Sequence, residues 1–247
     1  MTSRFYAPDL RVDQPFVLPS DESAHATRVL RLGPGDDLLA FDGQGRQVRG
    51  RVERGDRHGL TIRPLGIVDA AAELAVHLTL AQAVLKSDAM DAVVRDATMM
   101  GVSAIWPLVS TRTNVSTATL ARRDSADRWR RVAIASAKQC GRAVVPHVEP
   151  ASTVEAAIRR AGDAQGVLLV EPSVDVAITR IGAFRERPRP TAAVLAIGPE
   201  GGWSADEIDV ARAAGFDVVT LGTRTLRADI AGLVAIAVFQ AAWDCLE

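Results

Sequence analysis

Cysteine and long apolar runs are scarce in this chain, and each absence excludes a class of protein. The 247 residues include only two cysteines, Cys140 and Cys245, which are too few for a disulfide framework and, more than a hundred residues apart, lack the spacing of metal ligands. No apolar run reaches the roughly 18 residues of a membrane-spanning helix, and the longest, residues 230–243, is rich in alanine and glycine. Residues 1–6 lack the apolar stretch of a signal peptide. We therefore expect a cytoplasmic protein without a membrane segment.

An excess of charge of one sign is also missing. The chain has 29 lysines and arginines against 30 aspartates and glutamates, a net charge of -1. This balance excludes a polycation and leaves only local patches for nucleic-acid contacts. Its four histidines are scattered without ligand spacing, so we expect no metal site. With 48% hydrophobic and 24% charged residues, the composition is typical of a globular protein with a sizeable core.

The pattern of apolar, glycine and proline residues changes near residue 70. Before it, short β-type fragments alternate with glycine and proline turns, as at residues 32–36 and 41–45, a spacing typical of a small β-barrel. After it, apolar strands alternate with helical patterns, which predicts an α/β fold with a parallel sheet. We therefore predict one domain over residues 1–70 and a second over residues 74–247.

Periodicity and capping signals place the elements of the second domain. Gly101 is expected to end a helix whose buried face carries four apolar residues, namely Met90, Val93, Val94 and Ala97. Two helices are expected to open with a capping box, formed by Ser152 with Glu155 and by Ser204 with Glu207. Expected strands cover residues 74–81, 102–109, 144–148, 166–171, 192–197 and 216–221.

Two glycine loops follow expected strands in the last third of the chain. The strand at 192–197 stops at Gly198-Pro-Glu-Gly-Gly202, and the strand at 216–221 stops at Gly222. Open α/β sheets bind ligands at the carboxyl ends of their strands, so two such loops predict one pocket, although tight turns use glycine regardless of function. Neither loop has a Rossmann or P-loop pattern, which favours a ligand that is not held by its phosphates.

Six short motifs occur along the chain in a fixed order: Arg4-Phe-Tyr, His25-x-x-Arg-Val-Leu-Arg31, Gly101-Val-Ser, Gln139-Cys-Gly-Arg142, Gly198-Pro-Glu-Gly-Gly202 and Leu226-Arg227. In this order they resemble the 16S ribosomal RNA uracil-N3 methyltransferases almost from end to end. The resemblance implies a PUA-like N-terminal β-barrel and a C-terminal SPOUT methyltransferase domain, an α/β parallel sheet with a trefoil knot. It also implies S-adenosylmethionine as methyl donor, the 16S rRNA of the small ribosomal subunit as partner, and a homodimer.

The resemblance further implies which residues form the site. Three loops would bind the adenine of the cofactor largely through backbone groups, and a glycine lets the main chain approach an adenine edge. The implied cofactor residues are Leu169, Val170, Glu171, Ile197, Gly198, Pro199, Gly201, Gly202, Leu221, Gly222 and Leu226. RNA phosphates would be contacted by Arg4, Arg28 and Arg31, which position a substrate without reading its sequence.

Methylation of uracil N3 requires that N3 lose its proton and that negative charge on the uracil oxygens be stabilised. Arg227 is the candidate for this stabilisation, because a guanidinium offers planar, forked donors; the alternative is a surface ion pair. Asp229 and Glu200 are candidates for accepting the proton or orienting Arg227, and Glu200 could also simply favour a helix dipole. The family usually reads Leu-Arg-Thr-Glu-Thr where this chain has Leu226-Arg-Ala-Asp-Ile230, so we expect Asp229 to be structural rather than catalytic.

Two other functions are compatible with the sequence. One is a SPOUT ribose 2′-O-methyltransferase acting on transfer or ribosomal RNA, which normally has an asparagine and a catalytic arginine near its first motif; Asn114 is poorly placed for that. The other is a non-enzymatic RNA-binding protein on the same fold, which the altered residues 228–230 allow.

Overall fold

The structure, a computed structural model, describes residues 3–86 and 88–245, without the side chain of Arg122. The chain divides into two compact units. The first comprises Met1–Glu73 and Ile134–Val145, and the second comprises Leu74–Ala133 and Pro146–Glu247. Across the described ranges, no helix combines the length and the apolar character that crossing a membrane demands.

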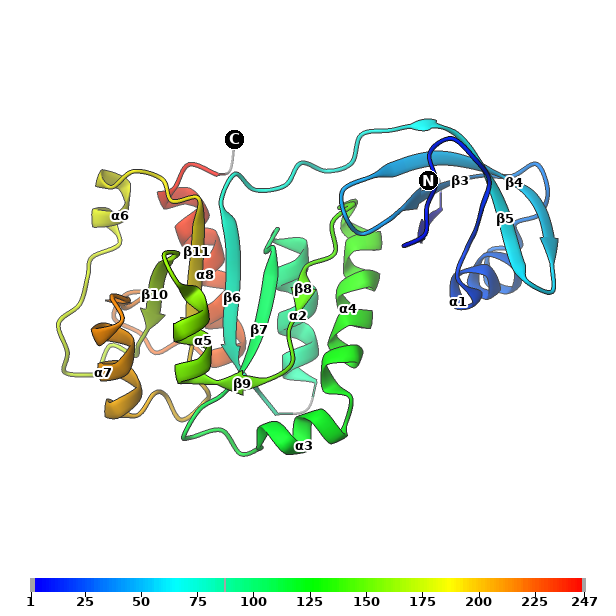
Figure 1. Cartoon of the computed structure of the whole chain (residues 1–247). Coiled ribbons are helices and arrows are strands. Elements are labelled where there is room, and N and C mark those ends of the chain that lie inside the picture. Colours follow the sequence, from blue (N-terminus) through cyan, green and yellow to red (C-terminus); the bar gives the residue numbers. More distant parts are fainter. Residues whose placement is uncertain (1–2, 87, 246–247) are drawn as a thin grey trace. The chain divides into compact units, whose positions relative to one another are not determined.

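The first unit is a five-stranded mixed sheet with a short helix packed against β5 (Figure 1). Its strand order is β1-β3-β4-β5-β2, with β1 parallel to β3 and the other pairs antiparallel. The strands expected before residue 70 are therefore confirmed, while the closed β-barrel and the bounds of the domain stay predictions. The elements are β1 (Arg4–Tyr6), β2 (Phe16–Val17), α1 (Ser20–Ala24), the π-helical turn η1 (His25–Val29), β3 (Asp37–Phe41), β4 (Gln47–Asp56) and β5 (Gly59–Ile67).

The second unit is built on a seven-stranded sheet in which every strand pair is parallel. The order is β12-β10-β11-β6-β7-β8, and β9 also pairs with β7. The strands are β6 (His77–Ala83), β7 (Ala104–Val109), β8 (His147–Val148), β9 (Ser152–Thr153), β10 (Gln165–Leu169), β11 (Ala192–Ile197) and β12 (Asp217–Val219). The predicted parallel α/β sheet is confirmed.

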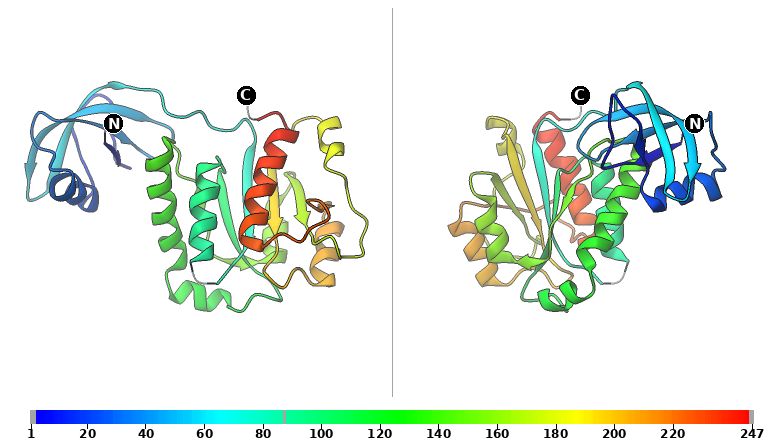
Figure 2. Two further views of the ribbon diagram at one scale, coloured as in Figure 1. Left: turned by 180° about the vertical axis from the view of Figure 1, so that it is seen from behind. Right: turned by 45° about the vertical axis from the view of Figure 1, so that its right-hand side comes forward.

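Helices cover both faces of this sheet. In Figure 1, α5 and α7 lie in front of it, and the view from behind in Figure 2 shows α2 and α8 over the opposite face. Such double coverage explains why the strands are almost continuously apolar. The helices are α2 (Ala89–Met99), α3 (Thr117–Arg122), α4 (Ser125–Cys140), α5 (Val154–Ala161), α6 (Gly182–Glu186), α7 (Ala205–Ala213) and α8 (Ala228–Ala242), of which α4 continues into the first unit.

One of the two predicted capping boxes is confirmed and the other is wrong. Ser204 caps α7: its hydroxyl accepts from the backbone N–H of Glu207, whose carboxylate accepts from the N–H of Ser204 at 2.8 Å. In α5 the N-cap is Thr153 instead of Ser152, and its hydroxyl accepts from the backbone N–H of Ala156. The predicted apolar face of α2 is also confirmed, because all four of its residues are buried.

The carboxylate of Asp217 helps to attach the long connection between β10 and β11 to the sheet, beside a backbone hydrogen bond from Thr179 to Val218 at 2.7 Å. Asp217, at the start of β12, accepts hydrogen bonds from Thr179 (2.8 Å), Gln165 (2.9 Å) and Arg187 (2.5 Å). Burial raises the pKa of Asp217, but the hydrogen bonds from Arg187, Thr179 and Gln165 lower it more, so that the net shift is downward. Folding therefore favours the ionised form of Asp217.

We predict that Asp217→Asn lowers the free energy of unfolding by about 1–2 kcal/mol at neutral pH, because one charged partner of a hydrogen-bond network is lost. Since folding depresses this pKa, the contribution is present above the ordinary value of 3.8 and disappears as the pH falls through the folded-state value. Urea unfolding of both proteins at neutral and acidic pH measures this. Exposed Asp175 supplies the control, Asp175→Asn; an equal loss in both variants, or a difference that persists in acid, contradicts the prediction.

Candidate functional site

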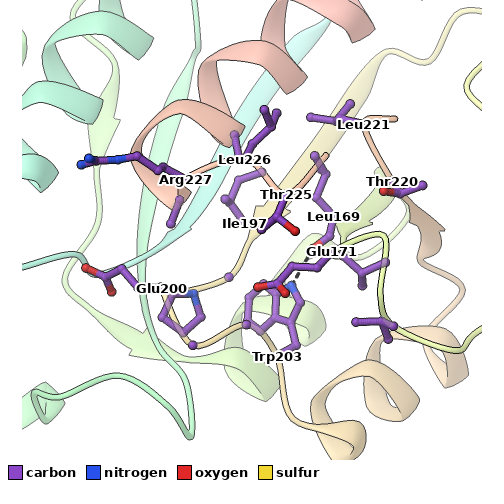
Figure 3. Close-up of a pocket in the computed structure, with 18 of the residues that line it drawn as sticks. Leu169, Glu171, Ile197, Glu200, Trp203, Thr220, Leu221, Thr225, Leu226 and Arg227 are labelled. Carbon is purple, nitrogen blue, oxygen red and sulfur yellow. Dashed lines mark hydrogen bonds between the residues drawn. The ribbon is translucent and has the colours of Figure 1, made fainter. Parts of the chain in front are cut away.

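A cavity of about 460 Å³ opens in the second unit where β10, β11 and β12 end (Figure 3). These three strands are neighbours in the sheet, and the carboxyl ends of parallel strands share one edge, which is where open α/β sheets bind ligands. The cavity is lined by residues that follow each strand, which fall at 169–174, 197–203 and 220–229. The two glycine loops predicted to form one pocket therefore do so.

The indole of Trp203 joins two of these loops. Its Nε1 donates to the carbonyl oxygen of Leu169 at 2.8 Å, and the ring lies directly against Gly198, where a Cβ would be 3.2 Å from Cε2 of the indole. A side chain at position 198 would therefore push Trp203 away. Gly202 completes the turn by donating its N–H to the carbonyl of Pro199 at 2.9 Å, with a φ of +70° that favours glycine.

Every residue predicted to bind the cofactor lines this cavity except Gly222, which lies in the third loop with a φ of +95°. The lining includes two kinds of side chain. Leu169, Ile197, Leu221 and Leu226 are apolar, and Glu171, Glu200, Arg112, Arg224, Arg227 and Asp229 are charged. A ligand that matches this lining has both apolar and charged parts.

The three predicted catalytic residues all lie at this cavity. Arg227 is the N-cap of α8 and pairs with Asp229 in the first turn through two bonds, Nε to Oδ1 at 3.1 Å and Nη2 to Oδ2 at 2.9 Å. This pairing raises the pKa of Arg227 and lowers that of Asp229. In Figure 3, Arg227 and Glu200 lie on the same side of the cavity, away from Leu221. The side chain of Arg227 is 78% exposed, so a substrate can reach it.

The structure adds Arg112, which sequence reasoning missed. It follows β7, and its Nη1 donates to the carbonyl oxygen of Gly201 at 2.7 Å, while its aliphatic stem covers the same glycine. Glu207 holds the preceding residue by accepting the backbone N–H of Thr111 at 2.8 Å. A signal was available: Arg112 comes just after a predicted strand, at the sheet edge where the glycine loops also lie.

The arginines predicted to contact RNA belong to the first unit. The guanidinium of Arg4 donates to Gln47 and to the carbonyls of Ala137, at 2.7 Å, and Arg142, at 2.9 Å. Arg4 therefore binds carbonyl groups at the end of α4, and burial lowers its pKa; an RNA contact would have to compete with these bonds. Arg28 and Arg31 are exposed in and just after the π-helical turn. The part of the chain described here contains no group of three or more histidine, cysteine, aspartate or glutamate residues placed to hold a metal ion.

Comparison with known proteins adds sequence and structural relatives. Residues 72–240 match the family described as RNA methyltransferase domain, and residues 18–65 match RNA methyltransferase PUA domain. The chain is 32% identical over 241 residues to the ribosomal RNA small subunit methyltransferase E of Synechocystis sp., with 95% of this chain and 76% of the relative covered. It is also 32% identical over 241 residues to the protein of that name from Mycobacterium tuberculosis, with 92% and 88% covered.

Two solved structures are similar over nearly the whole chain. The ribosomal RNA small subunit methyltransferase E of Neisseria gonorrhoeae, bound to S-adenosyl methionine, is 32% identical, with a TM-score of 0.86 and 98% of both chains covered. A Legionella pneumophila protein in complex with the same cofactor is 28% identical, with a TM-score of 0.86 and the same coverage.

Proposed function

This chain belongs to the ribosomal RNA small subunit methyltransferase E family, and on that premise we propose that it methylates N3 of a specific uridine in 16S rRNA with S-adenosylmethionine as donor. The observation that carries the proposal is the cavity at the ends of β10, β11 and β12, which apolar side chains line together with Arg227 and Glu200. The implied trefoil knot and homodimer are parts of the same proposal.

The cavity fits the proposed cofactor. Its volume of about 460 Å³ is that of a small-molecule site, and its apolar side chains come from three loops whose backbones can reach an adenine edge. Gly198 and Gly202 keep the second loop free of side chains at the cavity wall, because a Cβ at either position would meet a neighbour at 3.2 Å. When bound, S-adenosylmethionine supplies a methyl group on a positively charged sulfur, which becomes a neutral thioether after transfer.

Arg227 has the geometry to stabilise the charge that develops on the base. A uracil that loses its N3 proton carries negative charge on O2 and O4, and a guanidinium presents parallel donors to such oxygens. Asp229 orients Arg227 through its two hydrogen bonds. Because Arg227 lowers the pKa of Asp229, this carboxylate is a weak base, so we assign it the orienting role that its sequence context predicts.

Glu200 is the proton acceptor in this proposal. Its carboxylate is exposed in the second loop and lies on the same side of the cavity as Arg227. A base in that position can take the N3 proton while the guanidinium holds the oxygens. In the first unit, exposed Arg28 and Arg31 supply phosphate contacts that position the RNA without reading its sequence.

The substrate class is tested by incubating purified protein with S-adenosylmethionine labelled in its methyl group. The acceptors are small and large ribosomal subunits, each from a strain that lacks the modification, and deproteinised 16S rRNA. We expect label in the RNA of the small subunit and none in that of the large subunit. Label in the large subunit alone, or in transfer RNA added as a further acceptor, would contradict the assignment while leaving the methyltransferase activity in place.

A further inference from the structure

Two side chains of opposite charge both come close to Gly202. A Cβ at this glycine would lie 3.2 Å from Oε1 of Glu171 and 3.8 Å from Nη1 of Arg112. Glu171 reaches this point from the end of β10 and Arg112 from the turn after β7, and both line the cavity. Figure 3 shows the carboxylate of Glu171 beside Trp203. The bare glycine therefore brings two loops that are distant in sequence to one point of the cavity wall.

These two charges do not neutralise each other. Their nitrogen and oxygen atoms are not within the 4.0 Å of an ion pair, and among the described residues the carboxylate of Glu171 has no hydrogen-bond partner. Arg112 uses Nη1 for the carbonyl of Gly201 and keeps Nε and Nη2 without a partner in the same set. An anion and a cation are thus held a short distance apart with donors and acceptors available.

We propose that Glu171 and Arg112 together recognise the α-amino acid end of the cofactor, Arg112 binding its carboxylate and Glu171 its ammonium group. This inference rests on the proposed function. A zwitterion matches two opposite charges that both lie beside Gly202 without pairing, and each contact is a charge-assisted hydrogen bond. The apolar side chains of the lining are left for the adenosyl group.

The pair suits an amino acid better than an RNA backbone. A phosphate would be attracted by Arg112 but repelled by Glu171, whereas a zwitterion satisfies both. Arg112 is also held in place by its bond to Gly201 and by the Glu207–Thr111 contact behind it, so little side-chain entropy is lost on binding.

The test compares two ligands that differ only at the proposed contact. S-Adenosylhomocysteine carries the amino acid end, and 5′-methylthioadenosine has the same thioether nucleoside without it. In titration calorimetry we expect Glu171→Gln and Arg112→Met each to raise the dissociation constant of S-adenosylhomocysteine about 10-fold, the effect of losing one charged hydrogen bond. The dissociation constant of 5′-methylthioadenosine should not change. Arg112→Lys should lose less affinity for S-adenosylhomocysteine than Arg112→Met, because lysine keeps the positive charge. Arg180→Ala and Glu186→Gln, at exposed positions outside the cavity, are the matched controls.

Several outcomes overturn the proposal. If the variants bind both ligands equally more weakly, the pair stabilises the loops instead of contacting the amino acid end. If the affinity for neither ligand falls, the pair does not contact the cofactor. If Arg112→Met weakens only RNA binding, Arg112 contacts the substrate; if Glu171→Gln weakens S-adenosylmethionine but not S-adenosylhomocysteine, Glu171 faces the sulfonium. Failure of the wild-type protein to bind either nucleoside refutes the proposed function itself, which is distinguishable from these cases.

Discussion

Replacing Arg227 by alanine is expected to lower kcat for methyl transfer by about 10²–10³-fold, the loss typical of removing one donor that stabilises developing charge. The guanidinium is exposed at the cavity and held in a defined orientation by Asp229, at 2.9 and 3.1 Å. Affinity for S-adenosylhomocysteine should change little, because the apolar side chains of the lining and the glycine loops remain. Single-turnover assays at saturating RNA and cofactor isolate the transfer step.

Two companion variants of Arg227 and its partner sharpen this prediction. Arg227→Lys keeps the positive charge without the two parallel guanidinium donors, so its kcat should lie between those of wild type and Arg227→Ala. Asp229→Asn leaves Arg227 in place but orients it less well, so kcat should fall less in this variant than in Arg227→Ala. A kcat for Arg227→Ala within a few fold of wild type would show that Arg227 is only the surface partner of Asp229.

Gly202→Ala is expected to weaken cofactor binding by about 10-fold or more, because positive φ strains a non-glycine residue by about 1–3 kcal/mol in the loop that forms the cavity. The new Cβ would also lie 3.2 Å from the carboxylate of Glu171, which must then move. Titration with S-adenosylhomocysteine measures the loss, and thermal unfolding measures the accompanying change in stability.

Gly215→Ala is the matched control for this prediction. Gly215 follows α7 with a φ of +84°, a Cβ there meets no atom within 4 Å, and the residue does not line the cavity. It therefore carries the same backbone strain without the contact, and should lower stability while leaving the dissociation constant unchanged. Equal effects of the two variants on binding would mean that the second loop does not cradle the cofactor.

Much of the second unit could be predicted because its signals are local. Ser204 and Glu207 are three residues apart and cap their helix as expected, and the apolar spacing in α2 identifies its buried face. The capping box expected at Ser152 failed for a non-local reason: Ser152 pairs with Leu108 of β7, which keeps it in a strand. The helix then begins one residue later than predicted and buries Val154, Ala157, Ile158 and Ala161.

In the candidate site, too, local features could be predicted and contacts between distant residues could not. The glycine loops were recognisable because each comes within three residues of the end of an apolar strand. Arg112 was missed because its partner, Gly201, is 89 residues away in sequence, and no periodicity connects them. Arg4 was predicted from its motif, but its partners were not. Its motif predicts an RNA contact, but its hydrogen bonds to carbonyls more than 130 residues away could not be foreseen from the sequence.

Nucleoside analysis of the methylated RNA is the most direct test of the proposed chemistry. Small subunits from an unmodified strain are treated with the protein and labelled donor, and the RNA is digested to nucleosides and separated. The proposal predicts that the label elutes as N3-methyluridine and that Arg227→Ala yields almost none. Label on a ribose 2′-oxygen, or on another base, would contradict it.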